Sequence, residues 1–111
     1  MEDFVEQSLL FDFYGELLTE RQRKIYSAIV FEDYSISEVA REEGISRQGV
    51  HDLRKRCERI LEEYEERLHL VERFLRIRER IQEIRRLTDE EPFEKSLHEI
   101  DRIAQSVLEE L

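Results

Sequence analysis

The stretch ISEVAREEGISRQGVHDLRKR, residues 36–56, contains two helix-like patterns separated by one glycine. Ser35 precedes Glu38 by three residues, a spacing that allows a capping box at the start of a short helix. Gly44 supplies the positive φ angle that a tight exit from this helix requires, and Ser46 can cap the helix that follows. This layout of helix, glycine turn and helix is typical of a helix-turn-helix, whose second helix lies in the major groove of DNA.

The apolar residues of this stretch lie where a helix-turn-helix needs its core. Ala40 is small at the point where the two helices cross, so their backbones can approach each other. The predicted shared core consists of Val39, Ile45, Val50 and Leu53. At about 100° per residue, the inward face of the second helix is predicted to carry Val50, Leu53, Cys57 and Ile60.

The composition favours helices over sheets. The 111 residues include 41% charged residues but only three glycines, one proline and no tryptophan, so we expect an all-α protein. No apolar run approaches the roughly 18 residues of a membrane span, and the N-terminal MEDFVEQ is acidic, unlike a secretory signal. We therefore expect a cytoplasmic location. Cys57 is the only cysteine; we expect it to be a small buried residue, since no internal disulfide is possible.

Helical patterns continue on both sides of the central stretch. A first amphipathic helix is predicted to end near Leu18, with Leu9 or Leu10 and Phe13 or Tyr14 on its apolar stripe together with Phe4 and Leu17. Thr19 and Gln22 can form a capping box for a second helix, whose buried face is predicted to include Ile25, Ile29 and Val30.

From Ser46 to Pro92 no helix breaker occurs, although EEYEERLHL is a candidate turn between two apolar stripes. The first stripe comprises Ile60, Tyr64, Leu68, Val71 and Leu75, and the second Leu70, Phe74, Ile77, Ile81 and Ile84. A last helix is predicted from the apolar residues Phe93, Leu97, Ile100, Ala104, Val107 and Leu111.

We predict a helix-turn-helix domain over residues 1–65 and a helical extension over residues 66–111. The extension can fold back on the first helices or pair with a second chain. We favour a homodimer, because operator-type readers commonly use two half-sites.

Charge is distributed unevenly along the chain. The formal net charge is −10, which argues against unselective coating of nucleic acid. Residues 36–61, however, carry six basic and five acidic residues, whereas residues 62–111 carry nine basic and fifteen acidic residues. Only the helix-turn-helix segment is net positive.

We therefore predict that the outward-pointing residues of the second helix contact DNA. Gln48 can read an adenine edge, Arg47 or Lys55 can bind a guanine edge or a phosphate, and His51 can contact the groove. Arg54 and Arg59 are placed for backbone phosphates. Asp52 on the same face would repel phosphate. The alternative is that these basic residues form a solvated helix face that pairs with Glu58 and Glu62. The fold by itself does not determine the function, because three-helix units also serve as protein-binding modules.

An enzymatic function is not supported. The sequence has no phosphate-binding glycine loop, nucleophile elbow or zinc-binding histidine pair, and His69 and His98 lie apart without other ligands. The carboxylates of Glu62, Glu63, Glu65 and Glu66 are expected to form a solvated face. We expect no metal and no cofactor.

Three segments resemble the YlxM family of small bacterial helix-turn-helix proteins. They are YGELLTERQRKIY, SISEVAREEGISRQGVHDLRKRCERILEEYEERLHL and RFLRIRERIQEI, within residues 8–85. The resemblance implies a gene neighbourhood shared with components of the signal recognition particle, and hence a regulatory role in that pathway. LTERQR and SEVAREEGISRQGV are also similar to the promoter-reading C-terminal region of bacterial sigma factors, a similarity that implies base contacts by Arg47, Gln48, His51 and Lys55. Gly49 departs from this pattern, because alanine would be the better helix former.

Two functions are thus predicted. The first is a DNA-binding regulator that uses the second helix of the helix-turn-helix. The second is an adaptor whose acidic helices bind protein or RNA components of the targeting machinery, with the helix-turn-helix as scaffold; the acidic excess of residues 62–111 suits a basic partner.

Overall fold

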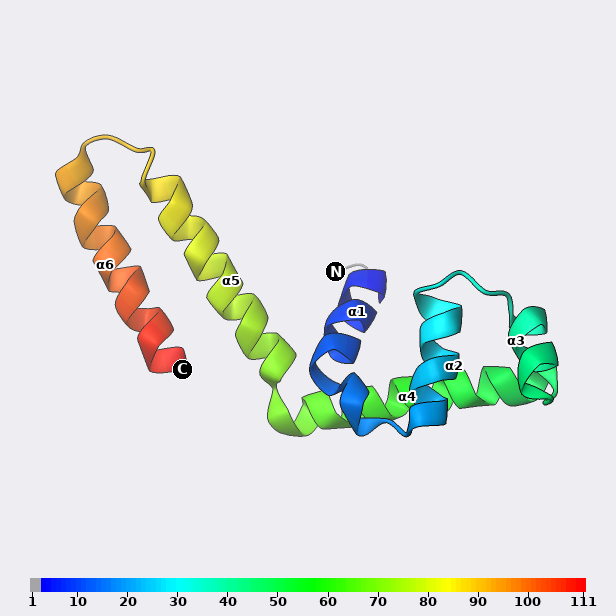
Figure 1. The fold of residues 1–111 in the computed structure, drawn as a ribbon. Helices are drawn as coiled ribbons and strands as arrows, with labels where there is room; N and C mark the ends of the chain where they lie inside the picture. Colours follow the sequence, from blue (N-terminus) through cyan, green and yellow to red (C-terminus); the bar gives the residue numbers. More distant parts are fainter. Residues whose placement is uncertain (1–2) are drawn as a thin grey trace. The chain divides into compact units, whose positions relative to one another are not determined.

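The computed structural model describes residues 3–111, which form α-helices, one short 3-10 helix and no strand (Figure 1). The prediction of an all-α fold is confirmed. The elements are α1 (Asp3–Tyr14), η1 (Gly15–Leu17), α2 (Glu20–Val30), α3 (Ile36–Glu43), α4 (Arg47–Leu68), α5 (Leu70–Leu87) and α6 (Phe93–Glu110). Contacts group them into two compact units, one ending at His69 and the other comprising Leu70–Leu111.

The predicted helix starts of α2 and α3 are both confirmed. The Gln22 N–H donates to Thr19 Oγ1 at 3.1 Å, and the Thr19 N–H donates to the Gln22 side chain at 3.0 Å. Ser35 and Glu38 form the same reciprocal pair, at 3.1 and 3.2 Å. Each box satisfies two amides that a helix start otherwise leaves without partners.

The turn between α3 and α4 has the predicted geometry. Gly44 lies at the end of α3 with φ 68°, and a Cβ added there would meet nothing within 4 Å. The backbone angle, and not a lack of space, therefore requires glycine at this position. Ser46 then caps α4, since its Oγ accepts a hydrogen bond from the Gly49 N–H at 2.9 Å.

The helix-turn-helix core joins α2, α3 and α4. Ile25 from α2 is buried together with Val39, Ala40 and Val50. The half-buried apolar side chains packed around this cluster are Ala28, Ile29, Ile36, Ile45 and Leu53. The predicted core residues all belong to this set. The side of α4 that carries Val50 and Leu53 therefore faces the core, and the opposite side faces outward.

The first helix also packs against α4 (Figure 1). Of the alternatives left by the sequence, Leu10 and Tyr14 are the buried ones. The predicted burial of Leu17 is wrong: Leu17 is 54% exposed and Leu18 is buried in its place. The 3-10 turn η1 explains the difference, because its tighter winding changes which residue faces inward.

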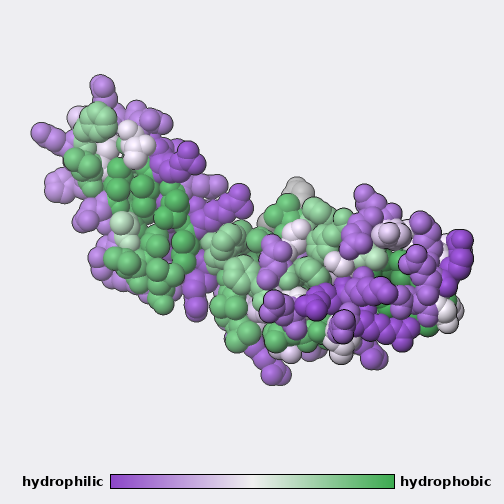
Figure 2. Space-filling model, viewed as in Figure 1, coloured by the Kyte–Doolittle hydropathy of each residue, from purple (hydrophilic) through white to green (hydrophobic). Residues whose placement is uncertain are grey.

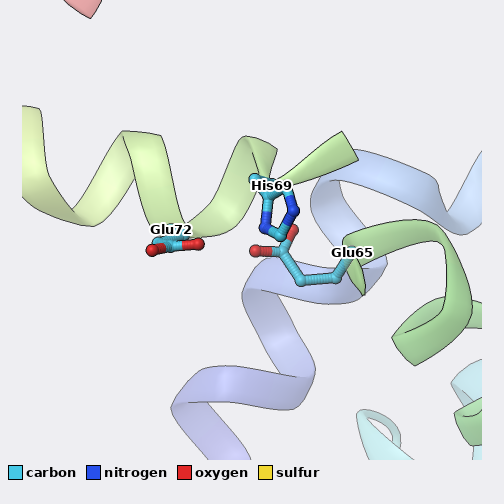
Figure 3. A group of neighbouring side chains, drawn as sticks. All are labelled: Glu65, His69 and Glu72. Atoms are coloured by element: carbon cyan, nitrogen blue, oxygen red, sulfur yellow. The ribbon is translucent and has the colours of Figure 1, made fainter. Parts of the chain in front are cut away.

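Two contacts mark the last turn of α4. The Tyr14 hydroxyl donates to Glu65 Oε1 at 2.6 Å, which ties α1 to α4. The helix ends at His69, whose left-handed backbone (φ 56°) turns the chain after Leu68 and whose N–H donates to the Glu65 carbonyl at 2.8 Å. Figure 3 shows Glu65 and His69 at this end of α4. The candidate turn in EEYEERLHL therefore lies at His69.

Tyr26 is a buried aromatic that the sequence patterns did not place in the core. Its ring is fully buried and stacks on Phe11, with centroids 5.9 Å apart. Its hydroxyl has no hydrogen-bond partner within residues 3–111, and burial raises its pKa to about 12. The predicted inward face of α4 also needs one correction, because Leu61 is fully buried whereas Ile60 is only half-buried.

The second unit is the hairpin of α5 and α6, joined by residues 88–92. Glu110 near the end of α6 accepts hydrogen bonds from two arginines of α5, Arg76 at 3.0 and 3.1 Å and Arg80 at 3.1 Å. These bonds hold the pKa of the Glu110 carboxyl below its usual range. Within residues 3–111 no helix combines the length and apolar character needed to cross a bilayer.

The apolar stripe predicted for α6 is only partly inward. Three residues of the predicted stripe are half-buried (Ile100, Ala104 and Val107), whereas Phe93, Leu97 and Leu111 are exposed. The fully buried residues of α6 are Ser96 and Ile103, which the prediction did not include. The stripe is wider than one neighbouring helix can cover, so its far edge remains on the surface.

Cys57 is fully buried, as predicted, and burial raises its pKa to about 11. Because the pKa of the thiol is higher in the folded protein than its ordinary value of 9.0, its contribution to stability is complete below about pH 9 and is lost as the pH rises towards 11. We expect a loss on the order of 1 kcal/mol in the free energy of unfolding between pH 8 and pH 10. Urea unfolding at the two pH values measures it.

The control is Cys57→Ala, which should lose less stability over the same pH interval. Tyr26 also has a raised pKa and affects both proteins alike at the upper end of the interval. An equal loss in both proteins would contradict a role for the thiol.

Candidate nucleic-acid interface

The first turns of α4 present a polar face that the core directs outward. Val50 and Cys57 are buried against the other helices. The side chains on the opposite side are exposed: Arg47, Gln48, His51, Asp52, Lys55, Arg56 and Arg59. From Arg47 to Arg59 the helix carries five basic and two acidic residues, so this face is locally positive on an acidic protein.

The predicted contact residues fall into two neighbouring groups. Arg47, Gln48 and His51 line a shallow hollow of about 440 Å³ together with Ile36, the first residue of α3. This hollow lies at the start of α4, where a recognition helix meets base edges.

Lys55 and Arg59 line a second hollow, of about 490 Å³, further along α4. Arg56 and Gln22 contribute to the same hollow, as does Asp52. Three cations thus lie beside the first turn of α2, an arrangement that suits a backbone phosphate.

Gln48 is held by Asp52. The Gln48 side-chain amide donates to Asp52 Oδ1 at 2.9 Å. One N–H and the carbonyl oxygen of Gln48 stay available, and these are the two groups that a bidentate contact with adenine uses. Asp52, which the sequence suggested only as a repulsive charge, therefore also orients a candidate base reader.

Arg54 is the one predicted contact that lies apart from both hollows. Its side chain is half-buried, and its Nε donates to Glu58 Oε1 at 3.1 Å, one turn further along α4. This ion pair corresponds to the solvated-face alternative. The other five predicted residues are brought together as two groups.

Sequence reasoning missed two contributors to the second hollow. Arg56 is absent from the predicted contacts, although it directly follows the basic residues Arg54 and Lys55 in the sequence. Gln22 was recognised only as a capping residue, and its nearness to α4 depends on how α2 packs.

The cations of α2 are already partly neutralised. Lys24 lies 3.3 Å from a Glu43 carboxylate oxygen, and Arg21 lies 3.7 Å from the other oxygen of that carboxylate. These exposed pairs link α2 to the end of α3, so the positive face is concentrated on α4.

Comparisons with known proteins agree with this architecture. The family model described as "Putative helix-turn-helix protein, YlxM / p13 like" (UPF0122) matches residues 1–100. A UPF0122 protein of Symbiobacterium thermophilum is 49% identical over 86 residues, covering 75% of this chain and 80% of the relative. One from Halalkalibacterium halodurans is 42% identical over 93 residues, covering 84% and 85%. One from Clostridium kluyveri is 36% identical over 108 residues, covering 97% of both chains. The chain therefore belongs to the UPF0122 family of YlxM / p13-like helix-turn-helix proteins.

Proposed function

We propose that this protein is a cytoplasmic DNA-binding regulator that inserts the start of α4 into the major groove. The observation that carries the proposal is the exposed, locally positive face of α4 directly after the Gly44 turn. A helix-turn-helix places this part of its second helix against base edges.

The two hollows suggest a division of roles. Arg47, Gln48 and His51 read base edges, because they lie on the first turns of α4 beside the start of α3. Lys55 and Arg59 bind backbone phosphate, with Arg56 as a third cation. The Arg54 side chain can bind a phosphate only if its ion pair with Glu58 is broken.

The domain organisation supports this division. Residues 1–65 would form the DNA-binding domain, and residues 66–111 would pack two copies into a homodimer. A dimer strengthens weak single contacts by engaging two half-sites. The resemblance to the YlxM family supports regulation linked to the signal recognition particle pathway.

Lys55→Ala tests the phosphate contact. We expect weaker binding to DNA and a fall of about 1 in the slope of log affinity against log salt, because one fewer counterion is released. Titration of a fluorescent duplex at several salt concentrations measures both quantities. Lys95→Ala is the matched control, because it removes the same charge from an exposed position on α6.

If Lys55→Ala leaves both the affinity and the salt slope at the wild-type values, the assignment of α4 as the DNA-binding helix is wrong. Equal losses in the two variants would mean that only net charge matters.

A protein adaptor is the second candidate, and one observation favours it. The connection between α5 and α6 exposes Asp89, Glu90 and Glu91 in a row, a patch that complements a basic partner. Neutralising these three residues as Asn, Gln and Gln should release such a partner in co-purification after nuclease treatment. Retention of DNA binding by the same variant would separate the two functions.

A further inference from the structure

The hairpin of α5 and α6 exposes an apolar face. On α6, Leu97 and Leu108 are 61% and 64% exposed; on α5, Ile81 is 44% exposed. Figure 2 shows the hydrophobic colour running continuously over this unit. Monomeric proteins rarely leave contiguous apolar patches larger than a few hundred Å² uncovered.

Helix geometry places these residues on one side of the hairpin. At about 100° per residue, Ile81 lies beside the α5 surface that meets α6. Leu97 and Leu108 lie at the equivalent position on α6. They are displaced around the α6 axis, in the same sense, from the surface that meets α5. α5 and α6 run in opposite directions. Equal displacements in the same sense around the two helix axes therefore place the apolar residues of both helices on the same side of the hairpin.

Each helix of the hairpin also carries an excess of one charge. α5 has six arginines and three acidic residues, whereas α6 has five acidic and two basic residues. A surface with one positive and one negative helix is complementary to a copy of itself.

We propose that a second copy of this chain covers the apolar face, so that two hairpins form a four-helix bundle in which α5 of each copy lies against α6 of the other. A two-fold axis parallel to the helices produces this arrangement, with every helix antiparallel to its neighbours. The other face-to-face arrangement has a two-fold axis perpendicular to the helices. It would place α5 against α5 and bring like charges together.

The edges of the face identify the ion pairs between copies. Arg78 and Arg85 lie on the edge of α5 away from its own α6, and Glu94 and Asp101 lie on the edge of α6 away from its own α5. All four side chains are exposed. In the proposed bundle these two edges meet, so arginines of one copy face carboxylates of the other.

This inference deepens the proposed function, because it assigns the surface that pairs two DNA-reading units, but assembly itself needs no DNA. Sedimentation of the full chain without DNA therefore tests it independently of DNA binding. The wild-type chain should sediment as a dimer at the concentrations used in the binding titrations. Leu97→Gln with Leu108→Gln should sediment as a monomer with unchanged helical circular dichroism.

The matched control is Lys95→Gln with Glu109→Gln, two exposed α6 residues on the opposite face whose joint replacement keeps the net charge. This variant should remain a dimer. A monomeric wild type, or a dimer that survives replacement of Leu97 and Leu108, would overturn the proposal.

Charge reversal tests which helices pair, and it uses only exposed residues, so folding is preserved. Arg78→Glu with Arg85→Glu should weaken the dimer at least about tenfold at low salt. Adding Glu94→Arg and Asp101→Arg to the same chain should restore the dimer. Failure of this restoration would overturn the pairing of α5 with α6, even if the chain is dimeric. Loss of DNA binding by a variant that still sediments as a dimer would instead count against the proposed function.

Discussion

Replacing Ile25 with alanine is expected to lower the free energy of unfolding by about 2–5 kcal/mol. Ile25 is 1% exposed and packs against Val39, Ala40 and Val50. The substitution removes buried apolar surface and leaves a cavity where three helices meet, and a close-packed core relaxes only partly around it. Urea unfolding followed by near-ultraviolet circular dichroism measures the loss, since Tyr14 and Tyr26 are buried in the same unit.

Two further variants calibrate this result. Ile25→Val removes one methylene group and should cost only about 0.5–1.5 kcal/mol. Leu17→Ala changes a residue that is 54% exposed and should stay within about 0.5 kcal/mol of the wild type. If Ile25→Ala lowered the free energy of unfolding no more than Leu17→Ala, the result would contradict the packing of α2 against α3 and α4.

Joint replacement of Arg47 and Gln48 by alanine is expected to weaken binding to a selected DNA site on the order of 100-fold or more. Each good bidentate base contact contributes about 1–3 kcal/mol of discrimination, and both side chains lie in the hollow beside Ile36. Binding to unrelated DNA should change much less, because phosphate contacts supply that affinity. The site comes from selection of genomic fragments by the purified protein, and competition titrations then give the two affinities.

Arg67→Ala with Gln82→Ala is the control for this pair. It removes the same side-chain types from exposed positions, and Arg67 lies about 30 Å along α4 from Arg47. Equal losses for selected and unrelated DNA in the Arg47 and Gln48 variant would contradict a base-reading role. A loss in the control as large as that in the test variant would contradict the location of the site.

The sequence predicted local structure well where short-range chemistry determines it. The boxes at Thr19 and Ser35 and the cap at Ser46 each depend on groups within three residues of one another. The left-handed turn at Gly44 depends on one backbone angle. These features form wherever the residues occur in that order, so they could be read directly from the chain.

Packing was harder to predict because it depends on residues distant in sequence. Tyr26 is fully buried and stacks on Phe11 of α1, a contact that the pattern of α2 by itself does not show. Leu61 replaces Ile60 in the core of α4; at about 100° per residue Leu61 lies within about 20° of Val50 and Ile60 about 80° away, so the helix periodicity already favoured Leu61.

The candidate interface shows the same division. The outward direction of Gln48 and Lys55 followed from helix periodicity alone, and both side chains are exposed as expected. Other interactions could not be predicted, because a polar side chain has several possible partners. Gln48 donates a hydrogen bond to Asp52, and Arg54 forms an ion pair with Glu58. Only the folded structure shows which partner each side chain takes.

By itself, the sequence determined that the chain is all-α and that residues 36–56 form a helix-turn-helix, because caps, a glycine turn and apolar periodicity are local properties. The tertiary structure decided which apolar residues are covered. It buries Ile103 between α5 and α6 but leaves Leu97 and Leu108 exposed. One neighbouring helix shields only one edge of a wide apolar stripe, so an apolar pattern in the sequence cannot tell a buried core residue from an interface residue.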